Sequence, residues 1–228
     1  MSMVITLSTY DGIVLASDSR LLFGNRGMYD DDSQEIYIMN HKICIALTGH
    51  AVSKAGVDFG DAIREYIMKN NYKENISDVV RDFYEELGPL SRNKSRFKDF
   101  NDALNIIGYS GNRTPQSILI EADTCPPKLA PVFDSFLRIN HPGKEGEDVT
   151  EYVKSIMEQY EENAGEIGVE KAIELCQTWI DEASELHRGI GGEVDIIQMT
   201  KDKTRWIKDK RNRHKRLSQK LSKRIMGR

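Results

Sequence analysis

The chain has 228 residues, a length that fits one large domain or two small ones. Hydrophobic residues make up 39% of it and charged residues 30%, which is typical of a soluble protein with a sizeable core. No run of residues approaches the ~18 consecutive apolar side chains of a membrane span, and the first residues lack the pattern of a secretory signal. We therefore expect a cytoplasmic protein that has no membrane partner.

Charge is unevenly distributed along the chain. The net charge is −4, yet residues 201–228 hold thirteen lysines and arginines against two aspartates. The body of the chain is therefore acidic and its C-terminal segment is strongly basic. In this segment Leu217, Leu221 and Ile225 recur every four residues, which predicts a helix from about Lys215 with a narrow apolar stripe.

Motifs for metals and cofactors are weak. Cys44, Cys125 and Cys176 are scattered and indicate free thiols in a reducing compartment. The acidic run 30–32 is more typical of a solvated loop than of a cation site, and the histidines lack ligand spacing. The chain has neither a P-loop nor a dinucleotide fingerprint, so we expect no cofactor and no metal.

The pattern of apolar residues predicts the secondary structure. β-Branched runs indicate strands at 4–9, 13–16, 35–39 and 43–48. The period then changes to that of amphipathic helices at 57–70 and 77–87, and two more strands follow at 104–109 and 117–120. Residues 125–146 hold four of the six prolines, so we expect irregular structure there. Helices at 148–162 and 169–187 precede a last strand at 193–200.

Helices that come in pairs are not the crossovers of a simple parallel sheet. Their order predicts two antiparallel sheets packed together, with a helix pair on each outer face. This is an α+β fold with a four-layer αββα sandwich. We assign it to residues 1–203 and treat residues 204–228 as a basic C-terminal extension, which is helical in part.

Four sequence segments resemble one known family. Residues 11–20 read DGIVLASDSR, and the segments ICIALTG at 43–49, LNIIGY at 104–109 and GGEVDI at 191–196 follow in register. Together they resemble proteasome β-subunits and their bacterial relatives, over roughly residues 2–200. The resemblance implies the N-terminal-nucleophile (Ntn) hydrolase fold, self-association into a ring, peptidase chemistry and an ATPase or unfoldase partner.

The resemblance also implies an active site. Ser2 stands in the place of the nucleophile, whose general base is the residue's own α-amino group, so the site requires removal of Met1. Asp18 and Arg20 match two further site positions. Gly49 matches the glycine whose backbone N–H faces the oxyanion.

Other positions depart from the family pattern. Glu35, or Gln34 in a shifted register, replaces the expected lysine, and His187 and Ile190 replace an aspartate and a serine. A carboxylate at this position would raise the pKa of the amine and repel an oxyanion. Without the lysine, Asp18 and Arg20 are also interpretable as a buried ion pair that braces the end of a strand.

Three hypotheses follow. The first is a ring-forming, proteasome-like subunit with atypical or lost peptidase activity. The second is an active self-compartmentalising peptidase or amidase that uses Ser2, and a cation near Ser2 would favour it. The third is a scaffold whose basic tail binds nucleic acid. For the tail itself we also weigh a solvated extension and a helix that contacts the acidic body of a neighbouring subunit.

Overall fold

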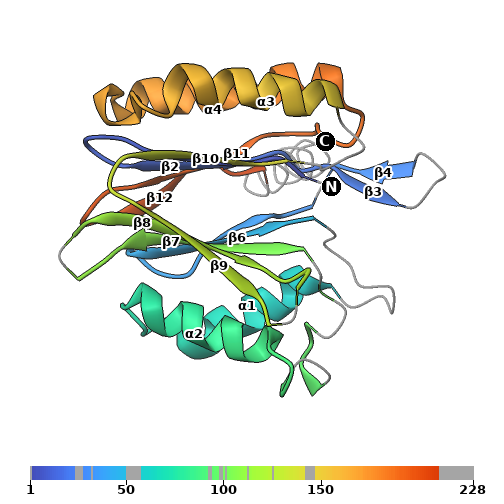
Figure 1. The fold of residues 1–228 in the computed structure, drawn as a ribbon, viewed down its shortest axis with the longest axis vertical. Coiled ribbons are helices and arrows are strands. Elements are labelled where there is room, and N and C mark those ends of the chain that lie inside the picture. Colours follow the sequence, from blue (N-terminus) through green and yellow to red (C-terminus); the bar gives the residue numbers. More distant parts are fainter. Residues whose placement is uncertain are drawn as a thin grey trace, which may run out of the picture.

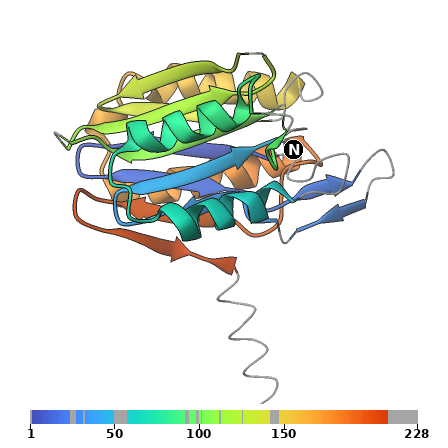
Figure 2. The same ribbon diagram turned by 90° about the horizontal axis from the view of Figure 1, so that it is seen from below.

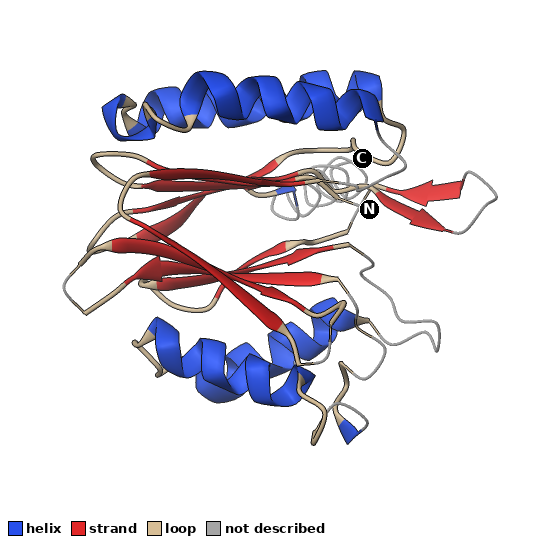
Figure 3. Ribbon diagram, in the orientation of Figure 1, coloured by secondary structure: helices blue, strands red, loops and turns tan. Residues whose placement is uncertain are grey.

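A computed structural model describes most of the chain, and its strands form two five-stranded antiparallel sheets that face each other (Figures 1 and 3). The described residues are 2–23, 28–31, 33–49, 58–91, 94–97, 100, 102–111, 113–124, 126–141 and 147–210. Side chains of residues 21–29 and 147 are outside this description.

The first sheet collects strands from both ends of the chain. Its order is β10 (Phe136–Asn140), β1 (Val4–Ser8), β2 (Ile13–Ser17), β11 (Asp195–Met199) and β12 (Thr204–Lys208). Every residue of β1 and β2 is buried, because this sheet is covered on both faces.

The second sheet is a meander. It consists of β5 (Ile36–Ile38), β6 (Ile43–Thr48), β7 (Ala103–Tyr109), β8 (Pro115–Glu121) and β9 (Lys128–Phe133), in chain order. A separate hairpin of β3 (Leu21–Phe23) and β4 (Met28–Asp30) projects beyond the sandwich (Figure 2). Strand β12 lies at the outer edge of the first sheet.

A helix pair covers the outer face of each sheet (Figure 1). Helices α1 (Phe59–Asn70) and α2 (Ile76–Leu87) pack on the second sheet around a phenylalanine cluster in which the Phe59 and Phe100 rings meet edge to face at 5.1 Å. Helices α3 (Glu147–Tyr160) and α4 (Val169–Leu186), with the short η3 (Ala164–Glu166), pack on the first sheet. The expected four-layer α+β sandwich is therefore present. Within the described residues, no helix is long and apolar enough to cross a membrane.

Three segments differ from the sequence prediction, and the first is the hairpin of β3 and β4, where no strand was expected. Residues 125–146, expected to be irregular, contain the hairpin of β9 and β10. Residues 204–208, assigned to the basic extension, form β12, which pairs with β11, so the first sheet continues past the expected boundary at residue 203. The predicted helix from Lys215 lies outside the described residues.

One apolar core lies under each helix pair, and a third fills the space between the sheets. Alternation along β1 points Met3, Ile5 and Leu7 toward the helices, whereas Val4 joins the core between the sheets. Ser2 has the same parity as Val4. The start of β1 therefore directs a polar side chain into one end of the space between the sheets.

Candidate active site

Ser2 meets a carboxyl group of the opposite sheet. Its hydroxyl donates a hydrogen bond to Oε1 of Glu35, the residue directly before β5. Ser2 is 4% exposed and Glu35 1% exposed. The side chain of Gln34 points elsewhere, since it donates to the Ile36 carbonyl (2.9 Å) and accepts from Arg64 (3.3 Å). The structure thus settles which of the two predicted residues faces Ser2: it is Glu35.

Asp18 accepts hydrogen bonds from three chain segments next to Ser2. Its Oδ1 accepts the backbone N–H of Met3 at 2.7 Å, and its Oδ2 accepts those of Gly191 at 2.8 Å and Arg20 at 3.3 Å. The residue after Ser2 is therefore held directly by Asp18. A carboxylate suits this place because it accepts several amide hydrogens at once.

Arg20 pairs with a partner that the sequence did not suggest. Its guanidinium binds Asp31, with Nε 2.7 Å from Oδ1 and a second nitrogen 3.1 Å from Oδ2. The expected ion pair between Asp18 and Arg20 is thus replaced by backbone hydrogen bonds to Asp18 and by a half-buried Arg20–Asp31 pair. The acidic run 30–32 therefore supplies a partner for Arg20. Its Asp32 lies outside the described residues, among which no metal-ligand cluster occurs.

Burial changes the protonation of both carboxyl groups. Desolvation raises the pKa of Asp18 to about 7, against the lowering effect of its backbone hydrogen bonds. Desolvation, and then the charge of Asp18, raise the pKa of Glu35 well above its usual value, while the Ser2 hydroxyl and the charge of Lys210 lower it. A neutral Glu35 does not repel an oxyanion. The objection to a carboxyl group at this position applies to its ionised form only.

Lys210 is the site residue that sequence reasoning missed. It follows β12, is 3% exposed, and its ammonium donates to the backbone carbonyl oxygens of Asp31 and Ser33. Its charge acts on Glu35. The sequence shows only a lysine within a basic tail, and nothing in its spacing distinguishes it from twelve other basic residues there.

The remaining predicted positions are only partly at the site. Gly49 directly follows β6 with a φ of +104°, and a Cβ there would overlap the side chain of Asp102, so glycine is required. Its role toward an oxyanion stays a prediction. Ile190 lies in the apolar core under α3 and α4, and Nδ1 of His187 accepts the N–H of Gly189 at 3.0 Å.

Unsatisfied polar atoms gather at this end of the sandwich. Among the described residues, the buried polar atoms with no hydrogen-bond partner include Ser17 Oγ, Asn140 Oδ1 and Glu35 Oε2. Ser17 and Asn140 both pair in register with Val4, two residues after Ser2. Because buried polar groups are normally satisfied, such a concentration favours a functional site over a purely structural one.

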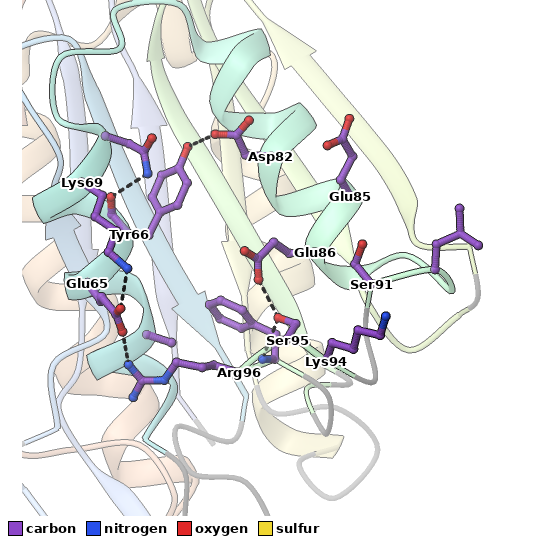
Figure 4. Close-up of a pocket in the computed structure, with 14 residues that line it drawn as sticks. Glu65, Tyr66, Lys69, Asp82, Glu85, Glu86, Ser91, Lys94, Ser95 and Arg96 are labelled. Carbon is purple, nitrogen blue, oxygen red and sulfur yellow. Dashed lines mark hydrogen bonds and ion pairs between the residues drawn. The ribbon is translucent and has the colours of Figure 1, made fainter.

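A groove between α1, α2 and residues 90–97 is a weaker candidate (Figure 4). It has a volume of about 740 Å³, and several of its charged side chains pair with one another. Glu65 binds Lys69 at 2.6 Å and Arg96 at 2.5 Å, and Tyr66 donates to Asp82 at 2.7 Å. These polar groups satisfy each other along the wall of the groove, so they do not converge on a ligand.

Comparison with known proteins adds no family assignment. No model of a known protein family matches the chain, and no curated protein matches it in sequence.

Proposed function

We propose that the chain is a proteasome-type, ring-forming subunit with an N-terminal-nucleophile fold and atypical amide-hydrolysing chemistry at Ser2. The observation that carries this proposal is the hydrogen bond from the Ser2 hydroxyl to the buried carboxyl group of Glu35. A nucleophile bonded to a potential base is the arrangement that nucleophilic catalysis requires. The four-layer sandwich and the DGIVLASDSR segment support the same assignment.

The chemistry follows from this pair. The proton of the Ser2 hydroxyl moves to Glu35 as Oγ bonds to the carbonyl carbon of a substrate amide. The carbon–nitrogen bond then breaks, and the leaving amine takes the proton from Glu35. Water, deprotonated by the same carboxylate, hydrolyses the ester, and Ser2 regains its proton. Cleavage of the bond between Met1 and Ser2 would free the α-amino group of Ser2 as a second proton acceptor.

Lost activity is the second candidate function, and a specific observation favours it. Ser2 is 4% exposed, and its hydroxyl hydrogen is donated to a carboxyl group whose pKa is raised by burial. A carboxyl group that holds its own proton is a poor base. With Glu35 protonated, the hydrogen bond between Ser2 and Glu35 would only stabilise the fold of a non-catalytic ring subunit.

Covalent labelling distinguishes an active Ser2 from the non-catalytic alternative. The intact mass of the natively expressed chain shows whether Met1 is removed, and a β-lactone electrophile followed by peptide mapping shows whether Ser2 is acylated. We expect labelling of wild type at Ser2, none in Ser2→Ala, and normal labelling in Ser155→Ala, which alters an exposed serine of α3. An unlabelled wild type with Met1 removed would establish the non-catalytic alternative.

A further inference from the structure

The carboxyl group of Glu35 keeps one oxygen open toward the site. Its Oε1 accepts the Ser2 hydroxyl, whereas its Oε2 is buried and accepts no hydrogen bond from the described residues. Buried carboxyl oxygens are normally satisfied. An open Oε2 beside Ser2 therefore points to a donor that becomes available in another covalent state of the chain.

Removal of Met1 creates such a donor next to Glu35. Hydrolysis of the Met1–Ser2 bond by water releases methionine and leaves an amine on Ser2. Within one serine, the nitrogen and the hydroxyl oxygen lie about 3–4 Å apart in any staggered rotamer. Because this hydroxyl already contacts Oε1, the new amine lies within reach of the same carboxyl group.

The backbone after Ser2 is anchored without the help of Met1. Oδ1 of Asp18 accepts the N–H of Met3 at 2.7 Å, and the Asp18 N–H donates to the Met3 carbonyl at 3.3 Å. Both hydrogen bonds survive the loss of Met1. They keep the first residue of the shortened chain facing Glu35.

The other charged groups of the site are engaged elsewhere. Asp18 already accepts three backbone N–H groups, and Asp31 binds the guanidinium of Arg20. The ammonium of Lys210 donates to two backbone carbonyl oxygens. Glu35 Oε2 is thus the carboxyl oxygen of the site that is open to a new ammonium group.

Burial favours a pairing of the two groups. Ser2 is 4% exposed and Glu35 1% exposed, so an ammonium or a carboxylate formed here alone would be strongly destabilising. The charge of an amino terminus lowers the pKa of Glu35 against the effect of burial. A proton that moves from the carboxyl group to the amine leaves two opposite charges that stabilise each other.

We propose that Glu35 binds the α-ammonium group of Ser2 once Met1 is removed, and that this ammonium is the cation of the site. The two groups then exchange the roles expected from the family resemblance. The carboxylate accepts the proton of the Ser2 hydroxyl, and the amine supplies the positive charge that a lysine would supply. Removal of Met1 converts Glu35 from a protonated, structural group into a base. The catalytic part of this inference rests on the function proposed for Ser2, whereas the ion pair does not.

The ionisation of the Ser2 amine tests the ion pair in the full-length assembly. Protein that begins at Ser2 is obtained by removal of a cleavable N-terminal fusion. Competitive acetylation by acetic anhydride, followed by mass spectrometry of the N-terminal peptide, gives the titration midpoint of the amine. We expect a midpoint about one to three pH units higher in wild type than in Glu35→Gln, because a neutral amide does not stabilise an ammonium. Glu151→Gln, at an exposed position of α3, should match wild type. Equal midpoints in wild type and Glu35→Gln overturn the proposal.

Wild type alone provides a second criterion, which does not depend on the folding of a variant. The midpoint of the folded chain must lie above that of the same chain unfolded in urea. Burial without a counter-ion would move the midpoint to lower pH instead. A folded midpoint at or below the unfolded one therefore also overturns the ion pair.

Ser2→Ala separates the ion pair from the function proposed for Ser2. This variant keeps the α-amine and lacks the hydroxyl, so we expect it to retain the high midpoint and to resist acylation by the β-lactone. Wild type with a high midpoint but no acylation refutes the proposed function and supports the ion pair. Wild type that is acylated while its midpoint equals that of Glu35→Gln refutes the ion pair and leaves Ser2 as the nucleophile.

Discussion

Replacement of Glu35 by glutamine tests whether the Ser2 site holds protons that the unfolded chain releases. The usual pKa of a glutamate is 4.5 and that of an aspartate 3.8, whereas burial raises the pKa of Asp18 to about 7 and that of Glu35 well above its usual value. Above about pH 4.5 the folded chain therefore retains protons that the unfolded chain loses. Each retained proton lowers the free energy of unfolding by about 1.4 kcal/mol per pH unit.

Stability from both groups is fully present at low pH and is lost as pH rises toward their folded pKa values. Between about pH 5 and pH 6 the free energy of unfolding of wild type falls by about 1.4 kcal/mol for each of the two groups that keeps its proton in the folded chain. In Glu35→Gln, which keeps an acceptor for the Ser2 hydroxyl and cannot ionise, Asp18 alone contributes about 1.4 kcal/mol over the same step.

Urea unfolding followed by tryptophan fluorescence measures this difference. The comparison uses one protein concentration throughout, because dissociation of an assembly would contribute to the apparent stability. Glu151→Gln, which alters an exposed residue of α3, is the control and should follow wild type at every pH. If Glu35→Gln and wild type lose stability equally steeply with pH, Glu35 is ionised in the folded protein and the reasoning is wrong.

Three other predictions concern packing and assembly. Gly108→Ala should destabilise the fold by about 1–3 kcal/mol in the same urea assay, because the added Cβ would lie 2.2 Å from the Lys42 carbonyl oxygen of the neighbouring chain segment. Gly111→Ala, which meets nothing within 4 Å, is its control. Light scattering should give a mass many times 26.0 kDa, and a stable monomer at micromolar concentration would contradict ring assembly. Deletion of residues 211–228, which leaves Lys210 in place, should reduce the assembly size at low and at high salt, because apolar docking of the predicted stripe is insensitive to salt. An unchanged size would favour a solvated tail, and salt-sensitive retention of nucleic acid by the full-length chain alone would favour nucleic-acid binding.

The layers of the fold are predictable because the local pattern of apolar residues shows which faces of each strand and helix are buried. The runs at β1, β2, β6 and β7 are apolar and β-branched, since both faces of these strands are covered. The helices show their buried stripes at the expected period. The segments that prediction missed lack such patterns.

Edge position explains why the strands β9, β10 and β12 were missed. β9 has mostly exposed or half-exposed side chains and contains Pro131, which is tolerated because the strand pairs on one side only. β10 carries Arg138 toward the space between the sheets, where its guanidinium binds the Ala130 carbonyl at 2.7 Å and Ser117 at 3.1 Å. β12 is rich in basic residues and reads as part of the tail. In each case pairing with a neighbouring strand, rather than local composition, decides the structure.

The candidate site was predictable where the family resemblance supplies a register, which includes Glu35 as well as the first strands. Ser2, Asp18 and Arg20 lie within a recognisable run, although the true partner of Arg20 is Asp31. The contact of Lys210 with Ser33 spans 177 positions in the chain, and no local pattern signals it.

The strand order of the first sheet has a consequence for how the chain folds. The second sheet is a meander of consecutive strands, and apart from the long helical connection between β6 and β7 its pairings close short loops and can form early. In contrast, β1 must pair with β10, and β2 with β11, across most of the chain. During synthesis the β1–β2 hairpin therefore emerges first, and the outer backbone groups of both strands stay unpaired until β10 and β11 are made. Such edges invite aggregation, and nascent chains of this protein should depend on chaperones until β11 has left the ribosome.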